Sequence, residues 1–311
     1  MGAINFLSHL KLLMYLYISS AAPGTYCLIL PCSPWTPRGY LNTQRKAHSA
    51  DDNHETNSLS SDRVLSPEYF KSVYEPQQLG LNDNVRTPWD IGGDRPQPDI
   101  VRAFSEGKLR GQIIDAGCGK GENCIYLAGK YGVSSVVGFD LAPGAIQTAM
   151  DRVARIETSD AFVDADTAGS EKTPFWTSPQ FLVASCTEIF DRYSSLVSSS
   201  KTKPHLFDVS IDSGLLHCLS DDDAIEYVKQ MARLVKPDTG RAYVGCFSTA
   251  NPDPWDNPRR LSEGYLRTLF CKANGWEVIS VRDTWWARPP GRGSSQGAFS
   301  MALWMEARRL P

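Results

Sequence analysis

The sequence has no run of Lys or Arg longer than a pair, and its 32 basic residues are balanced by 35 acidic ones, for a formal net charge of −3. Nucleic-acid phosphates and anionic lipids attract concentrated basic charge. We therefore expect no nucleic-acid partner and no binding to a charged membrane surface.

Cysteine pairs with the C-x-x-C spacing are also missing. The eight cysteines stand apart from one another, and most lie in apolar stretches, where a free Cys behaves as a small buried hydrophobe. This pattern predicts a reducing compartment and no metal site. We accordingly expect a cytoplasmic protein.

The N-terminal region lacks an uninterrupted apolar span of the roughly 20 residues that cross a bilayer. Residues 4–31 are strongly apolar, but His9 and Lys11 interrupt the first half, and Pro23 and Gly24 break the second. A secretory signal or anchor is one interpretation, because small residues follow the apolar stretch, and a non-core extension is the other. We expect no stable membrane insertion.

Residues 33–65 have few large apolar side chains and are rich in Ser, Asn, Asp, His and Pro. Burial in such a segment cannot offset the entropy lost on ordering it. We expect an apolar leader and disordered polar tether over residues 1–65, and one packed domain over residues 66–311. Ser66 can begin that domain as a helix cap, with Pro67 at the first helical position.

Short β-branched runs alternate with helical patterns in the rest of the chain, which is typical of an α/β protein with a parallel sheet covered by helices. Strands are predicted over residues 111–115, 133–140, 180–184, 207–212 and 241–247. Helices are predicted over residues 98–107, 122–130, 143–156 and 221–235. Residues 276–285 and 298–307 predict a final hairpin at one sheet edge.

Two polar stretches, residues 157–179 and 194–204, are longer than a usual connection between elements. We interpret them as disordered loops, and parts of a lid are the alternative.

The segment Ile113–Asn123, with the sequence IIDAGCGKGEN, carries the sharpest signal. An apolar strand ends at Asp115, and a turn containing Gly117, Gly119 and Gly121 leads into a helix. Glycine permits positive φ and a close approach of the backbone to a ligand. The segment indicates a nucleotide-type site at the carboxyl end of the first strand.

This loop lacks two phosphate-binding signatures. Glu122 stands where the dinucleotide fingerprint has its third Gly, and no Gly-Lys-Ser/Thr follows as in a Walker loop. A carboxylate there would repel a pyrophosphate at the helix N-terminus. Asp140, 19 residues after Gly121 at the end of the second strand, can instead bind both hydroxyls of a ribose. The sequence therefore predicts a nucleoside ligand without phosphate.

Three motifs in order, Gly117–Gly121, Gly138–Leu141 and Leu234–Pro237, resemble those of class I S-adenosylmethionine-dependent methyltransferases, over about residues 85–307. Upstream, Thr87–Gly92 (TPWDIG) is similar to a segment of the thiol, thiocyanate and halide methyltransferases of the thiopurine-methyltransferase-like branch. The resemblance implies a Rossmann-like, doubly wound, mostly parallel sheet of seven strands with a C-terminal antiparallel hairpin. It also implies S-adenosylmethionine as cofactor and methyl transfer to a small molecule.

The resemblance further implies which residues surround the cofactor. Trp89 would pack on its methionyl portion, Asp140 would bind its ribose, and Leu141 would lie on its adenine. The amino-acid portion would be surrounded by Asp115, Gly117, Cys118, Gly119 and Gly121.

The chain departs from that pattern after the third strand, and one further residue after the fourth strand extends it. The family usually has an acid after the third strand that accepts from the adenine amino group, whereas this chain has Ser185 and Cys186, so a hydroxyl or backbone group must substitute. Asp212, at the tip of the fourth strand, would reach the amino group or the ribose side of the cofactor.

His217 follows Asp212 closely and is our candidate general base, because imidazole titrates near neutral pH. A structural hydrogen-bonding group is the alternative. A thiol acceptor needs no base, since with a pKa of roughly 8.5 a few per cent is already thiolate at neutral pH. Arg95 would raise that fraction, and Trp255 would shape the acceptor pocket.

We therefore expect S-methylation of a thiol or similar nucleophile on a small molecule, with Asp212 and His217 as the catalytic residues. Three alternatives remain at this point: O- or N-methylation of a small metabolite, a nicotinamide oxidoreductase, and a non-catalytic cofactor-binding protein of the same fold.

Overall fold

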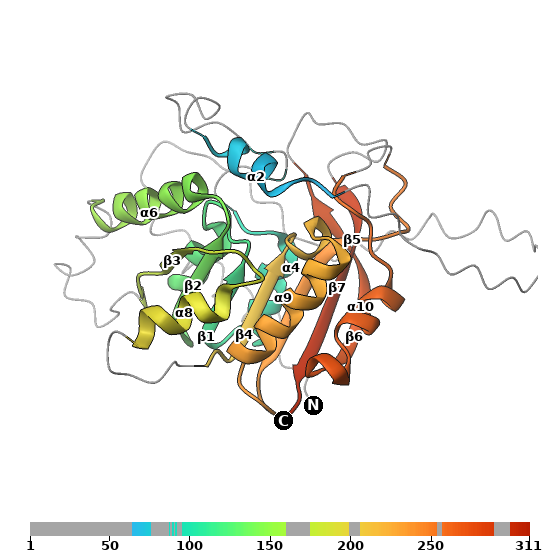
Figure 1. Cartoon of the computed structure of the whole chain (residues 1–311). Coiled ribbons are helices and arrows are strands. Elements are labelled where there is room, and N and C mark those ends of the chain that lie inside the picture. The colour runs from blue at the N-terminus through green and yellow to red at the C-terminus, as the bar shows by residue number, and fades with distance from the viewer. Residues whose placement is uncertain are drawn as a thin grey trace, which may run out of the picture. The chain divides into compact units, whose positions relative to one another are not determined.

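Seven strands form a single sheet in the order β3-β2-β1-β4-β5-β7-β6 (Figure 1). The computed structural model describes residues 64–75, 87, 89, 91, 95–159, 175–198, 206–253, 257–288 and 299–311. The strands are β1 (Gly111–Ala116), β2 (Val133–Asp140), β3 (Gln180–Val183), β4 (Val209–Ser213), β5 (Arg241–Phe247), β6 (Trp276–Ala287) and β7 (Phe299–Arg309).

Strands β1 to β5 are parallel to one another, and β7 pairs antiparallel with both β5 and β6. The mostly parallel seven-stranded α/β sheet and its C-terminal antiparallel hairpin are thus confirmed. Strand order reverses at β1, which lies between β2 and β4. Ligands bind at such a switch point, outside the carboxyl ends of the strands.

Helices cover both faces of the sheet. They are α2 (Pro67–Val73), α4 (Pro98–Ser105), α5 (Glu122–Ala128), α6 (Pro143–Glu157), α8 (Ile189–Ser198), α9 (Asp221–Leu234) and α10 (Glu263–Leu269), with 3-10 turns η2 (Leu216–Cys218) and η3 (Lys272–Asn274). One buried cluster joins the sheet to α8, α9 and α10, through residues such as Ile189, Tyr227 and Leu266. A second joins it to α4 and α5 through Ile100 and Leu127.

Two helix starts follow the predicted capping chemistry. The Ser66 hydroxyl accepts from the Tyr69 N–H at 3.2 Å, and Pro67 opens α2. The Ser220 hydroxyl accepts from the Asp223 N–H at 3.1 Å at the start of α9. Each side chain satisfies a backbone donor that has no partner within its helix.

The interpretation of residues 194–204 as a disordered loop is wrong for its first part. Residues 194–198 continue helix α8, which the sequence analysis did not predict. Ile189 and Tyr193 bury one side of that helix against the core, and its Ser-rich composition hides this pattern. The short helix α10 was not predicted either, although Ser262 caps it and Leu266 and Leu269 are buried.

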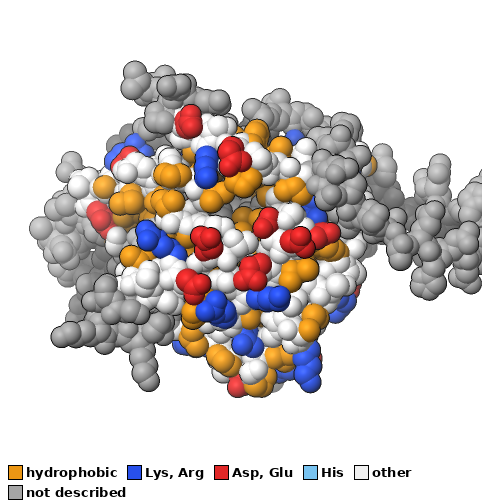
Figure 2. Space-filling view, viewed as in Figure 1, with side chains coloured by type: hydrophobic (Ala, Val, Ile, Leu, Met, Phe, Trp, Pro, Cys, Tyr) orange, Lys and Arg blue, Asp and Glu red, His pale blue; other side chains and the backbone are white. Residues whose placement is uncertain are grey.

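All described residues belong to one compact unit, Ser58–Pro311. Residues 1–63 lie outside the described ranges, so the leader and tether over 1–65 stay a prediction. Within the described ranges, no helix combines the length and apolarity needed to cross a bilayer. On the face seen in Figure 2, acidic and basic side chains are both spread among apolar ones.

Candidate functional site

A cavity of about 530 Å³ opens at the carboxyl ends of β1, β2, β4 and β5, where the strand order reverses. Pockets for small molecules have volumes of roughly 300–1,000 Å³. Its lining comes from the glycine loop and the strand ends, from the described residues between Val64 and Gln97, and from the end of β6. The turn after β4, Asp223, Asn257 and Pro258 also contribute.

The glycine loop and the end of β2 are joined through the Asp140 carboxylate. Gly119 N–H donates to its Oδ2 at 3.0 Å, and Ala142 N–H donates to its Oδ1 at 2.9 Å. Burial raises the pKa of this carboxyl, and the two backbone donors oppose that shift. The carboxylate is held at the cavity surface beside Leu141, with further lone pairs available to hydroxyl groups of a ligand.

Two observations test whether a nucleoside cofactor fits this end. Gly119 has φ +54°, and a Cβ there would lie 3.1 Å from Tyr74 Oη, so the loop offers bare backbone to the cavity. Thr87 lines the cavity, and its buried hydroxyl has no hydrogen-bond partner among the residues that the structure describes. A polar ligand can satisfy that hydroxyl, and the donor set suits a ribose and an amino-acid group.

A hydroxyl and a thiol stand at the cavity after β3. Ser185 Oγ lies 2.9 Å from Thr187 Oγ1 and accepts from the Thr187 N–H at 3.3 Å. Burial raises the pKa of the Cys186 thiol to about 12. Ser185, Cys186 and Thr187 therefore present neutral polar groups to the cavity.

Asp115, Gly121 and Asp212 lie outside the cavity lining. Asp115 is fully buried beneath the loop, accepts from Cys124 Sγ at 3.3 Å and Asn123 Nδ2 at 3.4 Å, and has its pKa raised to about 7 by desolvation. Gly121 is the N-cap of α5. Cys118, in contrast, lines the cavity, and burial raises its pKa to about 11, which keeps it a thiol.

Asp212 fixes the turn that carries His217. Its carboxylate accepts from the Leu215 N–H at 2.8 Å and the Leu216 N–H at 3.1 Å, at the start of η2. Desolvation raises its pKa to about 6, and these backbone donors oppose the shift. The geometry makes Asp212 a positioning residue for His217.

His217 lines the cavity, is 3% exposed, and accepts a hydrogen bond at Nδ1 from the Phe247 N–H at 3.1 Å. Burial, with a smaller contribution from the Arg259 charge, lowers its pKa to about 3, so the imidazole is neutral. Because Nδ1 accepts, the proton of a neutral ring is assigned to Nε2. In this state His217 is a hydrogen-bond donor to the cavity, in contrast to the general base that the sequence analysis expects.

Three rings form what we call the aromatic wall: His217, Phe247 and Trp286. His217 stacks on Phe247 with centroids 4.8 Å apart and planes 10° apart, and Trp286 lies 5.8 Å from His217 and 5.5 Å from Phe247. Sequence reasoning missed Phe247 and Trp286 as site residues. The hairpin could have indicated Trp286, because two antiparallel pairings bring the end of β6 to the same edge as the end of β5.

Of the two other residues predicted for the acceptor side, the structure describes only Arg95. Arg95 is exposed and outside the lining, and Trp255 falls outside the described residues. Arg288, which the sequence analysis did not select, supplies a cation at the cavity instead. Its Nη1 donates at 3.2 Å both to Asp253 Oδ2 and to Ser300 Oγ, and the side chain is thus held in place.

The negative charge of Glu122 is compensated. Its Oε1 lies 3.0 Å from Arg152 Nη1 and 3.8 Å from Lys120 Nζ. The charge-based reason against a pyrophosphate at this helix N-terminus is therefore weaker than the sequence indicates.

The N-terminal segment covers the cofactor end of the cavity. Trp89 is half-buried and donates from Nε1 to Tyr74 Oη at 3.2 Å, and its ring lies 6.1 Å from that of Phe70. Tyr74 also packs on Gly144 of α6 so closely that a Cβ there would lie 2.2 Å from the Tyr74 carbonyl oxygen. Helix α2 is thereby docked onto the start of α6, above the cavity.

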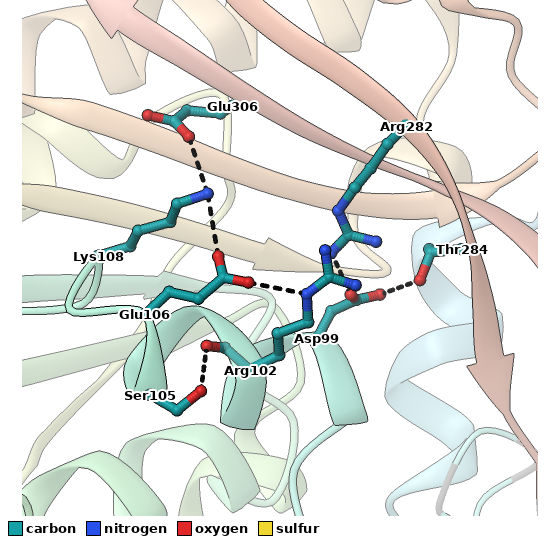
Figure 3. Close-up of polar contacts among 8 residues, drawn as sticks. All are labelled: Asp99, Arg102, Ser105, Glu106, Lys108, Arg282, Thr284 and Glu306. Carbon is teal, nitrogen blue, oxygen red and sulfur yellow. Dashed lines mark hydrogen bonds and ion pairs between the residues drawn. The ribbon is translucent and has the colours of Figure 1, made fainter. Parts of the chain in front are cut away.

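Polar contacts fasten α4 to the C-terminal hairpin (Figure 3). The Asp99 carboxylate accepts from the Arg282 guanidinium and, at 2.7 Å, from Thr284 Oγ1. In the loop after α4, Lys108 Nζ lies 3.3 Å from a carboxylate oxygen of Glu306 on β7.

At the cavity itself, Gln97 and the end of β6 exchange two hydrogen bonds. The Gln97 amide nitrogen donates to the Ala287 carbonyl at 3.1 Å, and the Ala287 N–H donates to the Gln97 amide oxygen at 3.0 Å. The backbone that carries Trp286 and Arg288 is therefore held rigidly from the side of α4.

Comparison with known proteins agrees with this geometry. A family model described as a methyltransferase domain matches residues 93–308. The chain is 29% identical, over 216 residues that cover 68% of it and 78% of its relative, to a 2-heptyl-1-hydroxyquinolin-4(1H)-one methyltransferase of Mycobacteroides abscessus.

Two solved structures are similar to the chain. One, from work on the conversion of a disulfide bond into a thioacetal group during echinomycin biosynthesis, is 26% identical with a TM-score of 0.55 and covers 78% of this chain and 92% of its own. The other, an S-adenosylmethionine-dependent methyltransferase from Anabaena variabilis ATCC 29413, has a TM-score of 0.55 over 81% of this chain and 99% of its own, and at 13% identity shows the fold alone. The chain belongs to the methyltransferase-domain family and is an S-adenosylmethionine-dependent methyltransferase of small molecules.

Proposed function

We propose that this enzyme methylates an acidic nucleophile that is already ionised when it reaches the cavity, and that a thiolate sulfur is the preferred acceptor. The observation that carries this proposal is the state of His217, whose Nδ1 accepts from Phe247 N–H and whose pKa is lowered to about 3. A neutral ring with its proton on Nε2 accepts no proton from a substrate.

Two carboxylates near His217 already accept hydrogen bonds from this chain. Asp223 lines the cavity, and its Oδ2 accepts from Ser220 Oγ at 2.7 Å. Asp212 lies outside the lining, with its carboxylate occupied by backbone donors. The cysteines that line this region have raised pKa values and are thiols. Arg288 also lines the cavity, but its charge is paired with the buried Asp253 carboxylate at 3.2 Å, so the proposal rests on His217 and not on a net positive charge.

The cofactor-binding roles proposed from the sequence fit the cofactor end. Asp140 would bind the ribose hydroxyls, Leu141 would lie on the adenine, and Ser185 would accept from or donate to its edge. The backbone from Gly117 to Gly119 would face the amino-acid portion, and Trp89 would cover the methionyl chain. When bound, S-adenosylmethionine supplies a methyl group on a sulfonium, which an anionic nucleophile takes by in-line displacement.

Residues of this chain then have three tasks in catalysis. The segment around Trp89 and Tyr74 excludes water above the cofactor. The turn held by Asp212 orients His217, whose Nε2–H donates toward the acceptor. Arg288, held by Asp253 and Ser300, forms a polar part of the cavity wall. The proton of the acceptor is lost to solvent before methyl transfer.

A second candidate acceptor is the acidic hydroxyl on the ring nitrogen of an N-hydroxy heterocycle. It is favoured by the 29% identity to the Mycobacteroides abscessus enzyme, whose named compound carries such a hydroxyl. The solved structure from echinomycin biosynthesis favours sulfur, because its described conversion is of a disulfide into a thioacetal.

The test is the pH dependence of kcat/KM for a series of aryl thiols and phenols of different acidity, with S-adenosylmethionine saturating. We expect the inflection to move with the pKa of each acceptor. A thiol of pKa roughly 8.5 should react about 30-fold faster at neutral pH than an equally nucleophilic phenol of pKa about 10, from ionised fractions alone. An inflection at one fixed pH for every acceptor would reveal a base on the enzyme and contradict the proposal.

An N-hydroxyquinolinone in the same panel separates the two candidates. Methylation of its oxygen with no product from any thiol would assign the enzyme to O-methylation. Cofactor binding without methylation of any acceptor would support the non-catalytic alternative.

A further inference from the structure

We propose that the aromatic wall, formed by His217, Phe247 and Trp286, binds a flat heteroaromatic ring of the methyl acceptor. In this complex His217 Nε2–H donates to a ring nitrogen or carbonyl oxygen beside the nucleophile. The inference rests on the proposed function in one respect, the placement of the acceptor at this end of the cavity.

The wall is a separate apolar cluster and not a part of the two large cores. Phe247 and Trp286 pack with Ala302 alone into a small buried cluster. Each of these two rings is 8% exposed, and both line the cavity. The small exposed area of these rings therefore faces the place where a ligand binds.

The polar edge of the wall is the Nε2 atom of His217. It makes no hydrogen bond with the described residues and is not fully buried, so it reaches the cavity surface. A donor that a ligand covers without offering an acceptor loses its hydrogen bond to water, which weakens binding. The wall should therefore bind most tightly those rings that carry a hydrogen-bond acceptor at this position.

The wall stands next to the cofactor loop. Gly214 lies between β4 and η2, and a Cβ built on it would be 3.0 Å from Trp286 Cη2 and 3.4 Å from His217 Nε2. Its neighbour Leu215 lies against Gly117 of the glycine loop, where a built Cβ would be 2.9 Å from Leu215 Cβ. A ring on the wall is thus one short turn away from the loop that would hold the methionyl end.

The position of the wall is fixed before any ligand binds. Gln97 holds the backbone after Trp286 through two hydrogen bonds with Ala287, and Asp99 holds Thr284 and Arg282 two and four residues before it (Figure 3). His217 is fixed by its bond from Phe247 N–H. A rigid surface favours a rigid flat ligand, and aromatic rings attract one another beyond the effect of buried area alone.

Three thiols distinguish the parts of this proposal. Quinoline-2-thiol has a flat ring and a nitrogen beside the sulfur, naphthalene-2-thiol has the ring without the nitrogen, and 2-mercaptoethanol has neither. We expect kcat/KM, corrected for the thiolate fraction, to fall in that order for the unaltered enzyme. Equal values for the three would overturn the inference and leave the proposed function intact.

Trp286→Leu tests the ring contact, and Trp285→Leu is the matched control. Trp285 precedes it on β6 and is 47% exposed, on the opposite side of the strand. Trp286→Leu should lower kcat/KM about tenfold or more for both ring thiols and less than twofold for 2-mercaptoethanol, whereas Trp285→Leu should leave all three unchanged. An equal loss for the three thiols contradicts the aromatic wall as a binding surface.

His217→Asn tests the hydrogen bond separately, because the amide oxygen of Asn can still accept from Phe247 N–H. It should reduce the preference for quinoline-2-thiol over naphthalene-2-thiol about tenfold. An unchanged preference would overturn the role given to Nε2–H, and this test stands even where Trp286→Leu does not fold.

Binding of quinoline-2-thiol and 2-mercaptoethanol to the enzyme saturated with S-adenosylhomocysteine, measured by calorimetry, does not depend on turnover. Binding of the ring thiol at least tenfold more tightly, lost in Trp286→Leu, supports the inference even if no thiol is methylated and the proposed function fails. Equal binding of the two contradicts it.

Discussion

At the scale of single residues, His217 has the chemistry that is hardest to infer from sequence. Its position after the fourth strand can be read from the sequence, and in the structure it lines the cavity. Its protonation is not readable, because that depends on burial and on the Phe247 N–H from a strand 30 residues away. The burial that lowers the pKa of His217 should also change how the stability of the protein depends on pH.

We predict that His217→Asn changes how stability depends on pH. The pKa of His217 is about 3 in the folded protein and roughly 6.5 in the unfolded chain, so below pH 6.5 the unfolded chain binds the additional proton. The wild-type protein therefore loses stability as pH falls from 6.5 toward 3, by at most about 1.4 kcal/mol per pH unit, and the variant lacks this loss.

Urea unfolding of both proteins at pH 7.5 and pH 5.0 measures this effect. The free energy of unfolding of the wild type relative to the variant should fall by about 2 kcal/mol at the lower pH, since the window includes 1.5 units below 6.5. Asp115 and Asp212, whose pKa values are raised, are present in both proteins and cancel in the difference. If the difference in unfolding free energy between wild type and variant is the same at both pH values, the pKa of His217 is the same in the folded and unfolded chain. That result would contradict the prediction.

The other site residues differ in whether the neighbouring sequence is enough to predict their position. Asp140, Leu141 and the loop glycines stand next to strand ends that periodicity predicts, and the structure places Asp140, Leu141, Gly117 and Gly119 on the cavity. Arg95 and Arg288 show the opposite case. Either could supply the cation on composition grounds, and only the pairing of β6 with β7 decides that Arg288 lies at the lining.

At the scale of elements, the strands were predicted within a few residues, because each is a short apolar run between turn residues. Helices α8 and α10 were missed since they are short and their buried side chains are few among polar ones. The docking of α2 was not predictable at all. It depends on a backbone contact between Tyr74 and Gly144, which lie 70 positions apart.

We predict that Gly144→Ala weakens cofactor binding by displacing α2. A Cβ at this position would lie 2.2 Å from the Tyr74 carbonyl oxygen, a backbone atom that moves only with its helix. Tyr74 and Phe70 would shift away from the cavity together with their contacts to Trp89. The dissociation constant for S-adenosylmethionine, measured by calorimetry, should rise at least tenfold.

Gly264→Ala on α10 is the matched control for this substitution. It is exposed, and the nearest atom to a Cβ there is Ser262 Oγ at 3.8 Å. Replacing a helical Gly by Ala should stabilise the protein by up to about 1 kcal/mol, with cofactor affinity unchanged. Tight cofactor binding by Gly144→Ala would show that α2 has no part in the cofactor site.

At the scale of the whole molecule, the described residues all belong to the unit Ser58–Pro311. The sequence analysis expects the packed domain to begin at Ser66, and the structure shows the expected cap of α2 at that residue. The boundary itself stays a prediction, based on the few large apolar groups of residues 33–65, which contribute little to a core.

We predict that a chain shortened to begin at Ser58 keeps the thermal midpoint and the S-adenosylmethionine affinity of the full chain. A chain shortened further, to begin at Thr87, lacks α2 and with it Phe70 and Tyr74. It should retain the sheet but bind the cofactor at least tenfold more weakly. Thermal unfolding with and without cofactor measures both effects. A lower midpoint in the first shortened chain would place residues before Ser58 within the folded core.

Strand β7 runs antiparallel to both of its neighbours, β5 and β6. Because β7 turns the chain back, β6 ends at the edge where β1 and β2 also end, although β6 is the outermost strand. The groups that would hold the cofactor therefore come from one half of the sheet, and much of the acceptor surface comes from the other. Substitutions at the end of β6 can alter which compounds are methylated while the glycine loop stays constant, so the architecture allows substrate range to diverge independently of the methyl donor.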